Sequence, residues 1–124
     1  MSELIHYNGE GSLNEMLAED SITLVDFSAI WCGPCQMLKP VLEEVAKTTD
    51  YKVIKVDVDQ SGDLAVEYEI RSVPTVIVFK NGKLEDRLTG FMTKDEIMRK
   101  INKLLAVAAT TALVLTGCVG GKKE

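Results

Sequence analysis

The sequence predicts an α/β fold, with a central mixed sheet of five strands flanked by about four helices. Apolar runs typical of strands alternate with amphipathic stretches typical of helices, in the order βαβαβαββα. Between the last two strand candidates lies Asn81-Gly82, a dipeptide typical of a type I′ hairpin. The alternation favours a sheet with helices on both faces, and the hairpin adds antiparallel strands to it.

The first helix and the first long strand are expected between residues 12 and 27. Apolar residues at helical spacing predict a helix over Ser12–Glu19, and Ser12 with Glu15 forms a candidate capping box. Ile22–Phe27 is a nearly continuous apolar run rich in strand formers. Such a run is typical of a strand buried on both faces, with Asp26 as its one charged residue.

The next two elements are a long helix and a strand. Pro34–Thr48 carries one apolar stripe and one charged face, the pattern of an amphipathic helix. Pro34 stands at the start, where proline is tolerated, whereas Pro40 lies inside and is expected to kink the helix. Lys52–Val58 alternates enough to predict a strand.

The last four elements follow in quick succession. Ser61–Glu69 is the weakest helix candidate. Thr75–Phe79 and Leu84–Leu88 predict the two strands of the hairpin. Thr93–Leu105 predicts a final helix that opens with a capping box completed by Glu96.

Length and composition are those of one ordinary globular domain. The chain has 124 residues, of which 46% are hydrophobic and 27% are charged, and this balance argues against a disordered protein. The formal net charge is −5 and no basic face stands out, so a nucleic-acid binder is not expected. Three cysteines are too few for a disulfide scaffold.

Cellular compartment is predicted from the first ten residues. Met1–Glu10 contains neither a basic segment nor an apolar segment of the kind found in secretory signals, so a cytoplasmic protein is expected. In that compartment a close cysteine pair is more often catalytic or metal-binding than a structural disulfide.

An uncharged stretch ends the chain. Between Lys103 and Lys122 lie eighteen uncharged residues, and six of them are Thr or Gly, which weakens the case for a membrane-spanning segment. Leu115–Cys118 resembles the lipid-attachment motif of a bacterial lipoprotein signal, but such signals act at an N-terminus. Three interpretations stay open: an extension of the last helix, a membrane tether and a disordered tail.

The predicted organisation is therefore one domain and a tail. We expect the domain over residues 1–105, the extension over residues 106–124, and a monomer. Cys118 is expected to be a free thiol without a role in catalysis, with an intermolecular disulfide as the alternative.

Trp31-Cys32-Gly33-Pro34-Cys35 follows the predicted buried strand and opens the long helix. Two intervening residues bring the thiols close enough to form a disulfide, and a helix N-terminus favours the thiolate of Cys32. Cys32 would attack a target disulfide to form a mixed disulfide. Cys35 would then attack Cys32 and release the reduced target.

Two other interpretations of the cysteine pair compete with this one. A zinc site needs about two more Cys or His ligands, and only His6 and Cys118 remain, at opposite ends of the chain. A purely structural disulfide is disfavoured by the expected compartment. No metal site is therefore predicted.

The sequence resembles the thioredoxin family from about residue 3 to Leu105. The resemblance is carried by the cysteine motif and by matches in the expected order at Asp26, Val73-Pro74-Thr75, Lys80-Asn81-Gly82 and Gly90. It implies the thioredoxin fold and a protein-disulfide reductant that is itself re-reduced by thioredoxin reductase, an NADPH-dependent flavoprotein. It implies no bound cofactor besides the redox-active disulfide Cys32–Cys35.

The resemblance places Asp26 behind the disulfide, where it helps to deprotonate Cys35. Burial in an apolar strand should also raise the pKa of Asp26, so that it exchanges a proton near neutral pH. Lys55 matches the lysine near that aspartate and would tune it. The plainer interpretations are an edge-strand or capping carboxylate and a solvated strand lysine.

Pro74 matches the family's cis-proline, which faces the cysteines. It would expose backbone groups that pair with an extended substrate and would leave no side-chain donor to trap a metal. A strand-initiating proline is the plainer interpretation. Gly33 and Pro34 stiffen the loop between the cysteines and add no charge, so the pair should be reducing rather than oxidising.

An apolar rim around Cys32 would bind unfolded or loop segments of substrates, although each of its residues could simply be packing. The expected substrate contacts are Trp31, Ile70, Val73, Thr75, Gly90 and Phe91. The chain departs from the commonest family pattern at Ser28, where many members have a second Trp, and at Ile30 and Ser72. A non-catalytic binding subunit of a larger complex is the alternative function, and an oxidase or isomerase is disfavoured by Gly33-Pro34.

Overall fold

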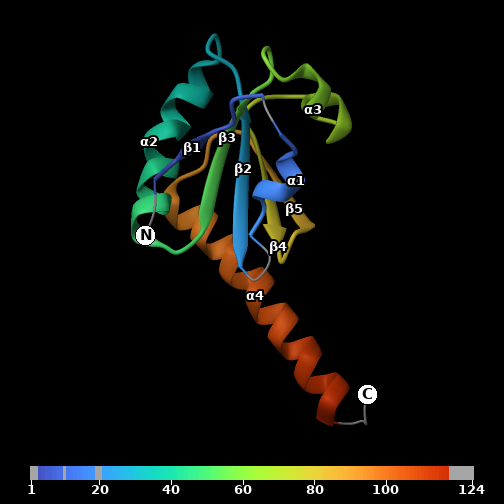
Figure 1. The fold of residues 1–124 in the computed structure, drawn as a ribbon. Helices are drawn as coiled ribbons and strands as arrows, with labels where there is room; N and C mark the ends of the chain where they lie inside the picture. The colour runs from blue at the N-terminus through green and yellow to red at the C-terminus, as the bar shows by residue number, and fades with distance from the viewer. Residues whose placement is uncertain (1–2, 10, 19–20, 118–124) are drawn as a thin grey trace. The chain divides into compact units, whose positions relative to one another are not determined.

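The computed structural model describes residues 3–9, 11–18 and 21–117, with side chains described as far as residue 105. Its elements follow the predicted order βαβαβαββα (Figure 1). They are β1 (Ile5–His6), α1 (Leu13–Met16), β2 (Ile22–Ser28), α2 (Gly33–Thr48), β3 (Lys52–Asp57), α3 (Gly62–Glu67), β4 (Thr75–Lys80), β5 (Lys83–Thr89) and α4 (Lys94–Gly117). Contacts divide the chain after Lys94 into the sheet with α1 to α3 and a second unit that contains most of α4.

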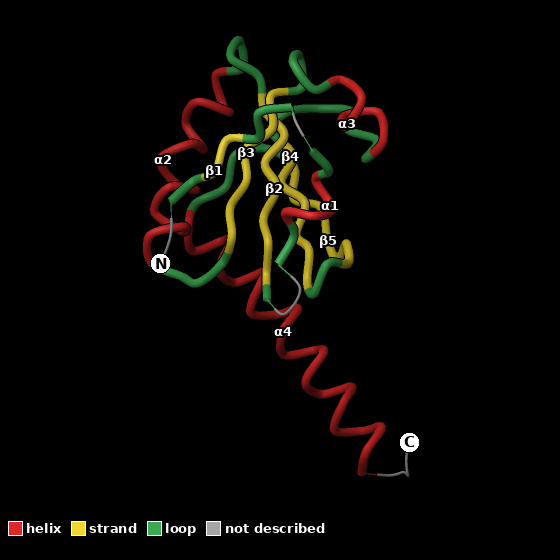
Figure 2. Tube along the Cα trace, viewed as in Figure 1, coloured by secondary structure: helices red, strands yellow, loops and turns green. Residues whose placement is uncertain are grey.

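The five strands form one mixed sheet in the order β1-β3-β2-β4-β5 (Figure 2). β3 pairs in parallel with both β1 and β2, whereas β4 pairs antiparallel with β2 and β5. β2 is therefore the central strand, and all seven of its residues are buried. In its register Asp26 lies beside Lys55 of β3 and Val76 of β4.

Alternation along β2 divides the core between the two faces of the sheet. Val25 and Phe27 pack in a cluster with Leu13 and Leu17 from the α1 segment, and Leu64 of α3 packs against the same cluster. Because strand side chains alternate, Leu24 and Asp26 point to the opposite face. Figure 1 shows α2 on the other side of the sheet from α1 and α3. Asp26 thus shares its face of the sheet with the helix that carries the cysteines.

α1 is shorter than predicted, and the capping-box prediction for Ser12 is wrong. Ser12 occupies the N-cap position, but its side chain makes no capping hydrogen bond, and its carbonyl oxygen instead accepts from Glu15 N at 3.2 Å. The helix ends after Met16 because the backbone of Leu17 is extended (φ −72°, ψ 136°), and Ala18 N donates to Thr23 Oγ1 at 2.9 Å instead of continuing the helix.

α3 also ends earlier than predicted. Glu69 adopts a left-handed conformation with φ 55°, and Ile70 N donates to Ala65 O at 2.8 Å, which closes the helix end with a turn. α2, in contrast, runs as one helix through Pro40, and its last turn carries Lys47.

α4 extends beyond its predicted end at Leu105 and reaches Gly117. The added residues are rich in alanine and contain neither glycine nor proline before Gly117, so nothing in the sequence stops the helix. None of the helices in the described part of the chain is long and apolar enough to cross a membrane. Cys118 lies outside the described residues.

The hairpin prediction is confirmed. β4 and β5 are joined by Asn81 and Gly82 alone, and both residues have positive φ, 54° and 82°. The pairing of β4 with β5 also shifts its register between Val78 and Phe79, where no glycine in the sequence indicates it.

The hairpin turn yields a stability prediction. Gly82→Ala should destabilise the protein by about 1 kcal/mol, because an L side chain is strained at positive φ even in open space. Gly62→Ala is the matched control, since Gly62 also has open space but begins a helix without a positive φ. Urea unfolding should show unchanged or slightly higher stability for Gly62→Ala. Equal losses in the two variants would contradict the strain argument.

Candidate active site

The two cysteines of the motif lie at the N-terminus of α2 and are joined by a disulfide. Cys32 is the N-cap residue, and its Sγ accepts a hydrogen bond from Cys35 N at 3.2 Å. The same N–H, together with the helix dipole, would stabilise a thiolate on Cys32 after reduction. Cys32 is 6% exposed and Cys35 is 0% exposed, so of the two residues only Cys32 reaches the surface.

Ala29 packs with the two cysteines in a small buried cluster, and Val58 and Val73 pack against it. This apolar surrounding shields the sulfur of Cys35 from water. Ala29 and Val58 were not singled out in the sequence as site residues. Their positions in the sequence could have indicated this role, because each lies at or just after the end of a predicted strand, on the side of the cysteine motif.

The loop before β4 faces the disulfide. The Val73–Pro74 peptide bond is cis, and Cys32 Sγ lies 3.6 Å from the carbonyl oxygen of Val73. The loop is held from both sides, because Gly90 N donates to Pro74 O at 2.9 Å and Thr75 Oγ1 donates to Ser72 O at 2.8 Å. The cis-Pro74 loop therefore lies next to the sulfur of Cys32.

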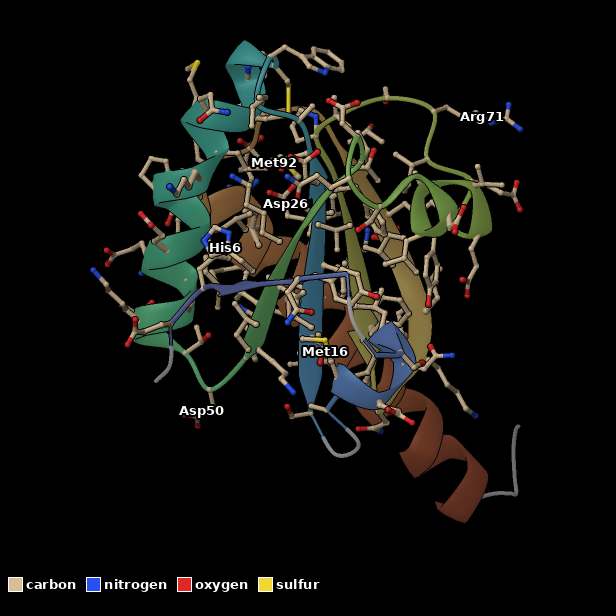
Figure 3. The ribbon with its side chains drawn as sticks, turned by 45° about the horizontal axis from the view of Figure 1, so that its top comes forward. His6, Met16, Asp26, Asp50, Arg71 and Met92 are labelled. Atoms are coloured by element: carbon tan, nitrogen blue, oxygen red, sulfur yellow. A yellow bond between two sulfur atoms is a disulfide. The ribbon has the colours of Figure 1, made fainter. Side chains whose placement is uncertain are left out.

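Asp26 is 1% exposed in the centre of β2, and neither carboxylate oxygen accepts a hydrogen bond from any described residue. Burial raises the pKa of Asp26 to about 7 from its ordinary 3.8, and the charge of Lys55 opposes this rise. The edge-strand interpretation of Asp26 is wrong because β2 has neighbours on both sides, and the capping interpretation is wrong because the carboxylate binds no described N–H group. Figure 3 shows Asp26 within the domain, with the disulfide drawn above it as a yellow bond.

Trp31 is the only tryptophan and is 69% exposed. Its Nε1 donates to Asp59 Oδ2 at 2.8 Å, which fixes the indole at the rim of the site. Asp59 was not predicted, but a signal existed: β2 and β3 are parallel, so the residues that follow them meet at one edge of the sheet.

An apolar hollow of about 280 Å³ lies beside the cysteines. It is lined by Trp31, Val58, Ala65, Ile70, Arg71, Ser72 and Val73. Three of the six predicted substrate contacts, Trp31, Ile70 and Val73, are thus brought together.

The other three predicted contacts are placed differently. Gly90 is tied to the Pro74 loop by its backbone hydrogen bond. Phe91 follows Gly90 and is 41% exposed. Thr75 is 3% exposed and lines a second hollow rather than the apolar one.

The third predicted feature of the site is the absence of a metal, which concerns here only the side chains that the structure describes. There, no three His, Cys, Asp or Glu side chains gather as a metal site would require. His6 is exposed on β1 (Figure 3).

A buried and an accessible sulfur, joined at a helix N-terminus and faced by a cis-proline loop, are suited to exchange disulfides with another molecule. The fold and site thus define a thiol–disulfide exchange protein. The Thioredoxin family model matches residues 5–103, so the chain belongs to the thioredoxin family. It is a thiol–disulfide oxidoreductase that reduces protein disulfides.

Known relatives agree with this assignment. The chain is 46% identical over 93 residues to the thioredoxin of Mycoplasmoides gallisepticum, covering 74% of this chain and 93% of that protein. It is 46% identical over 89 residues to the thioredoxin of Staphylococcus epidermidis, covering 70% and 86%. A mutant thioredoxin from Halobacterium salinarum superposes with a TM-score of 0.76 at 38% identity, covering 82% of this chain and 89% of that one.

Proposed function

We propose that Cys32 is the nucleophile and Cys35 the resolving cysteine of the reductase. The Cys32 thiolate attacks one sulfur of the substrate disulfide; that disulfide breaks, and its second sulfur leaves with the electron pair and takes up a proton. Cys35 then loses its proton and attacks Cys32 Sγ, which releases the first substrate sulfur. Two electrons pass to the substrate, and the Cys32–Cys35 disulfide remains. The observation that carries this assignment is the contrast between the accessible Cys32 and the enclosed Cys35.

We propose that Asp26 accepts the proton of Cys35 in the second step. It shares the α2 face of the sheet, and its raised pKa leaves it able both to take and to return a proton near neutral pH. Lys55 is its register partner on β3, and its positive charge keeps the pKa of Asp26 from rising further.

The Pro74 loop and the apolar hollow would bind the substrate. An extended segment would pair with the backbone next to cis-Pro74 while its side chains enter the hollow beside Trp31. Gly33 and Pro34 would keep the cysteine loop stiff and uncharged.

The remaining assignments extend the family relationship. The substrates would be disulfide-containing proteins, and the electrons would come from an NADPH-dependent flavoprotein thioredoxin reductase. The chain would act as a cytoplasmic monomer with no bound cofactor besides its disulfide. Residues 1–105 would form the catalytic domain, which the family match over residues 5–103 supports.

The first test is the redox equilibrium of the pair. The oxidised protein is equilibrated with defined ratios of a dithiol and its disulfide, and the fluorescence of Trp31 reports the oxidised fraction. A strongly reducing midpoint supports a reductant. A midpoint near or above that of glutathione would instead indicate an oxidase, an isomerase or a redox sensor.

Pro34→His should make the pair more oxidising by about 30 mV or more, because a cation beside Cys32 at the helix N-terminus stabilises the thiolate of the reduced form. Pro34→Gln is the control, since it removes the proline without adding charge. The same equilibrium measurement compares the variants. A shift of equal size in both would attribute the effect to loop stiffness and contradict the charge argument.

A further inference from the structure

A second hollow, of about 420 Å³, lies beside the Pro74 loop. It is lined by Glu69, Arg71, Ser72, Thr75, Arg87 and Thr89. We call it the basic hollow, because two arginines and one acidic residue line it in a chain whose net charge is −5. The mechanism described above makes no use of it.

Arg87 is held in place within the basic hollow. Its Nη2 donates to the carbonyl oxygen of Tyr68, which follows α3. Tyr68 is itself fixed, because its ring lies 5.9 Å from the rings of Phe27 and Phe79 and its hydroxyl donates to Asn14 Oδ1 at 3.3 Å. A guanidinium has five N–H donors, and the bond to Tyr68 uses one of them.

The basic hollow adjoins the apolar hollow beside Cys32. Arg71 and Ser72 line both hollows, so the two lie on either side of one short piece of chain. Figure 3 shows the Arg71 side chain extending outward from this loop. Two residues further on, Val73 O lies 3.6 Å from Cys32 Sγ. A substrate segment bonded to Cys32 therefore passes next to the loop that separates the two hollows.

Charge decides what the basic hollow can hold. A carboxylate suits a guanidinium, which can donate two parallel N–H bonds to it. The hydroxyls of Ser72 and Thr89 line the same hollow and can donate further hydrogen bonds. A lysine or arginine on the substrate would meet two like charges there against the single opposite charge of Glu69.

We propose that the basic hollow binds an Asp or Glu side chain of the substrate protein close to the disulfide under attack. Arg87 provides the fixed contact, and the exposed Arg71 provides a second one. This specificity rests on the proposed function, because it needs a substrate segment held at Cys32. The preferred substrates are proteins with an acidic residue near the reducible disulfide.

The test uses disulfide peptides that differ at one position. One set carries a single Glu at one to four residues on either side of the attacked cysteine, and the matched set carries Gln there. The reduced full-length protein is mixed with each peptide, and Trp31 fluorescence gives the second-order rate constant. At one or more positions the Glu peptide should react about three- to fivefold faster than its Gln partner.

Variants of the two arginines test whether the basic hollow causes the preference for Glu peptides. Arg87→Gln and Arg71→Gln should each bring the ratio of Glu to Gln rates toward 1, and Arg87→Lys should retain part of it. Lys83→Gln is the matched control, because Lys83 is an exposed cation on the same strand but does not line the hollow, and it should keep the wild-type ratio.

Three results would overturn the proposal. The first is equal rate constants for the Glu and Gln peptides at every position, and the second is a preference for Glu that survives both Arg→Gln variants. The third is an Arg87→Gln variant whose rate constant falls equally for both peptides, because such a loss reflects structure alone. Failure of the proposed function looks different, since the wild type would then reduce neither peptide set, or Cys32→Ser would reduce both.

Discussion

Replacing Cys32 by serine should lower the rate of protein-disulfide reduction by roughly 1000-fold or more, to the level of the solution reaction. Serine keeps the size of the side chain but does not form a thiolate, so no mixed disulfide can begin. The fold should survive, because Cys32 is an N-cap residue and serine is a favoured N-cap. Insulin reduction with an external electron source measures the loss, and circular dichroism checks the fold.

Cys35→Ser should fail in a different way. The first attack still occurs, but no thiol remains to displace the substrate from Cys32, so a covalent protein–substrate adduct should accumulate. Mass spectrometry should find one substrate per chain, attached at Cys32. Cys118→Ser is the control for the third cysteine and should reduce disulfides at the wild-type rate. The double variant Cys35→Ser/Cys118→Ser should still accumulate the covalent adduct with the substrate. Full activity of Cys32→Ser, or adducts on Cys118 alone, would contradict the assigned roles.

Local sequence signals predicted most of this fold. The apolar run of β2, the amphipathic stripe of α2 and the Asn81-Gly82 turn each depend on residues close together in the chain, and each was found where expected. The cysteine motif could also be identified from the sequence, because both thiols and the start of the helix lie within five consecutive residues.

Features that depend on distant residues were missed or could not be derived. α1 ends early because Thr23 binds the backbone of Ala18, and nothing within α1 itself signals this. The hydrogen bond from Trp31 to Asp59 joins two strand ends that only the parallel register brings together. The arginines of the basic hollow come from a loop and a strand that lie far apart in the sequence, so no motif contains them.

Asp26→Asn should remove a large pH dependence from the stability of the oxidised protein. In the folded chain burial raises the pKa of Asp26 to about 7, whereas its ordinary value is 3.8. Between these values the folded protein holds a proton that the unfolded chain has lost, so the free energy of unfolding falls as the pH rises. At about 1.4 kcal/mol per pH unit, the loss approaches about 4 kcal/mol by pH 8. The destabilisation by Asp26 is thus absent below about pH 4 and complete above about pH 7.

Urea unfolding at a series of pH values tests this expectation. The asparagine side chain has no proton to lose, so the wild type and the Asp26→Asn variant should be most alike near pH 4, and the variant should gain stability relative to the wild type as the pH rises. Asp63→Asn is the matched control, because Asp63 is an exposed carboxylate and its replacement should leave the slope of the curve unchanged. If the difference in unfolding free energy between the wild type and Asp26→Asn did not change with pH, the pKa of Asp26 would not be raised in the folded protein.

The same Asp26→Asn variant should also slow the release of substrate from Cys32, because an amide cannot accept the proton of Cys35. Single-turnover reduction of a disulfide peptide measures this step, since the mixed disulfide forms first and then decays. Asp63→Asn again serves as the control and should release substrate at the wild-type rate. Normal release in an Asp26→Asn protein that has lost the pH dependence of its stability would separate the two effects and assign the Cys35 proton to another base.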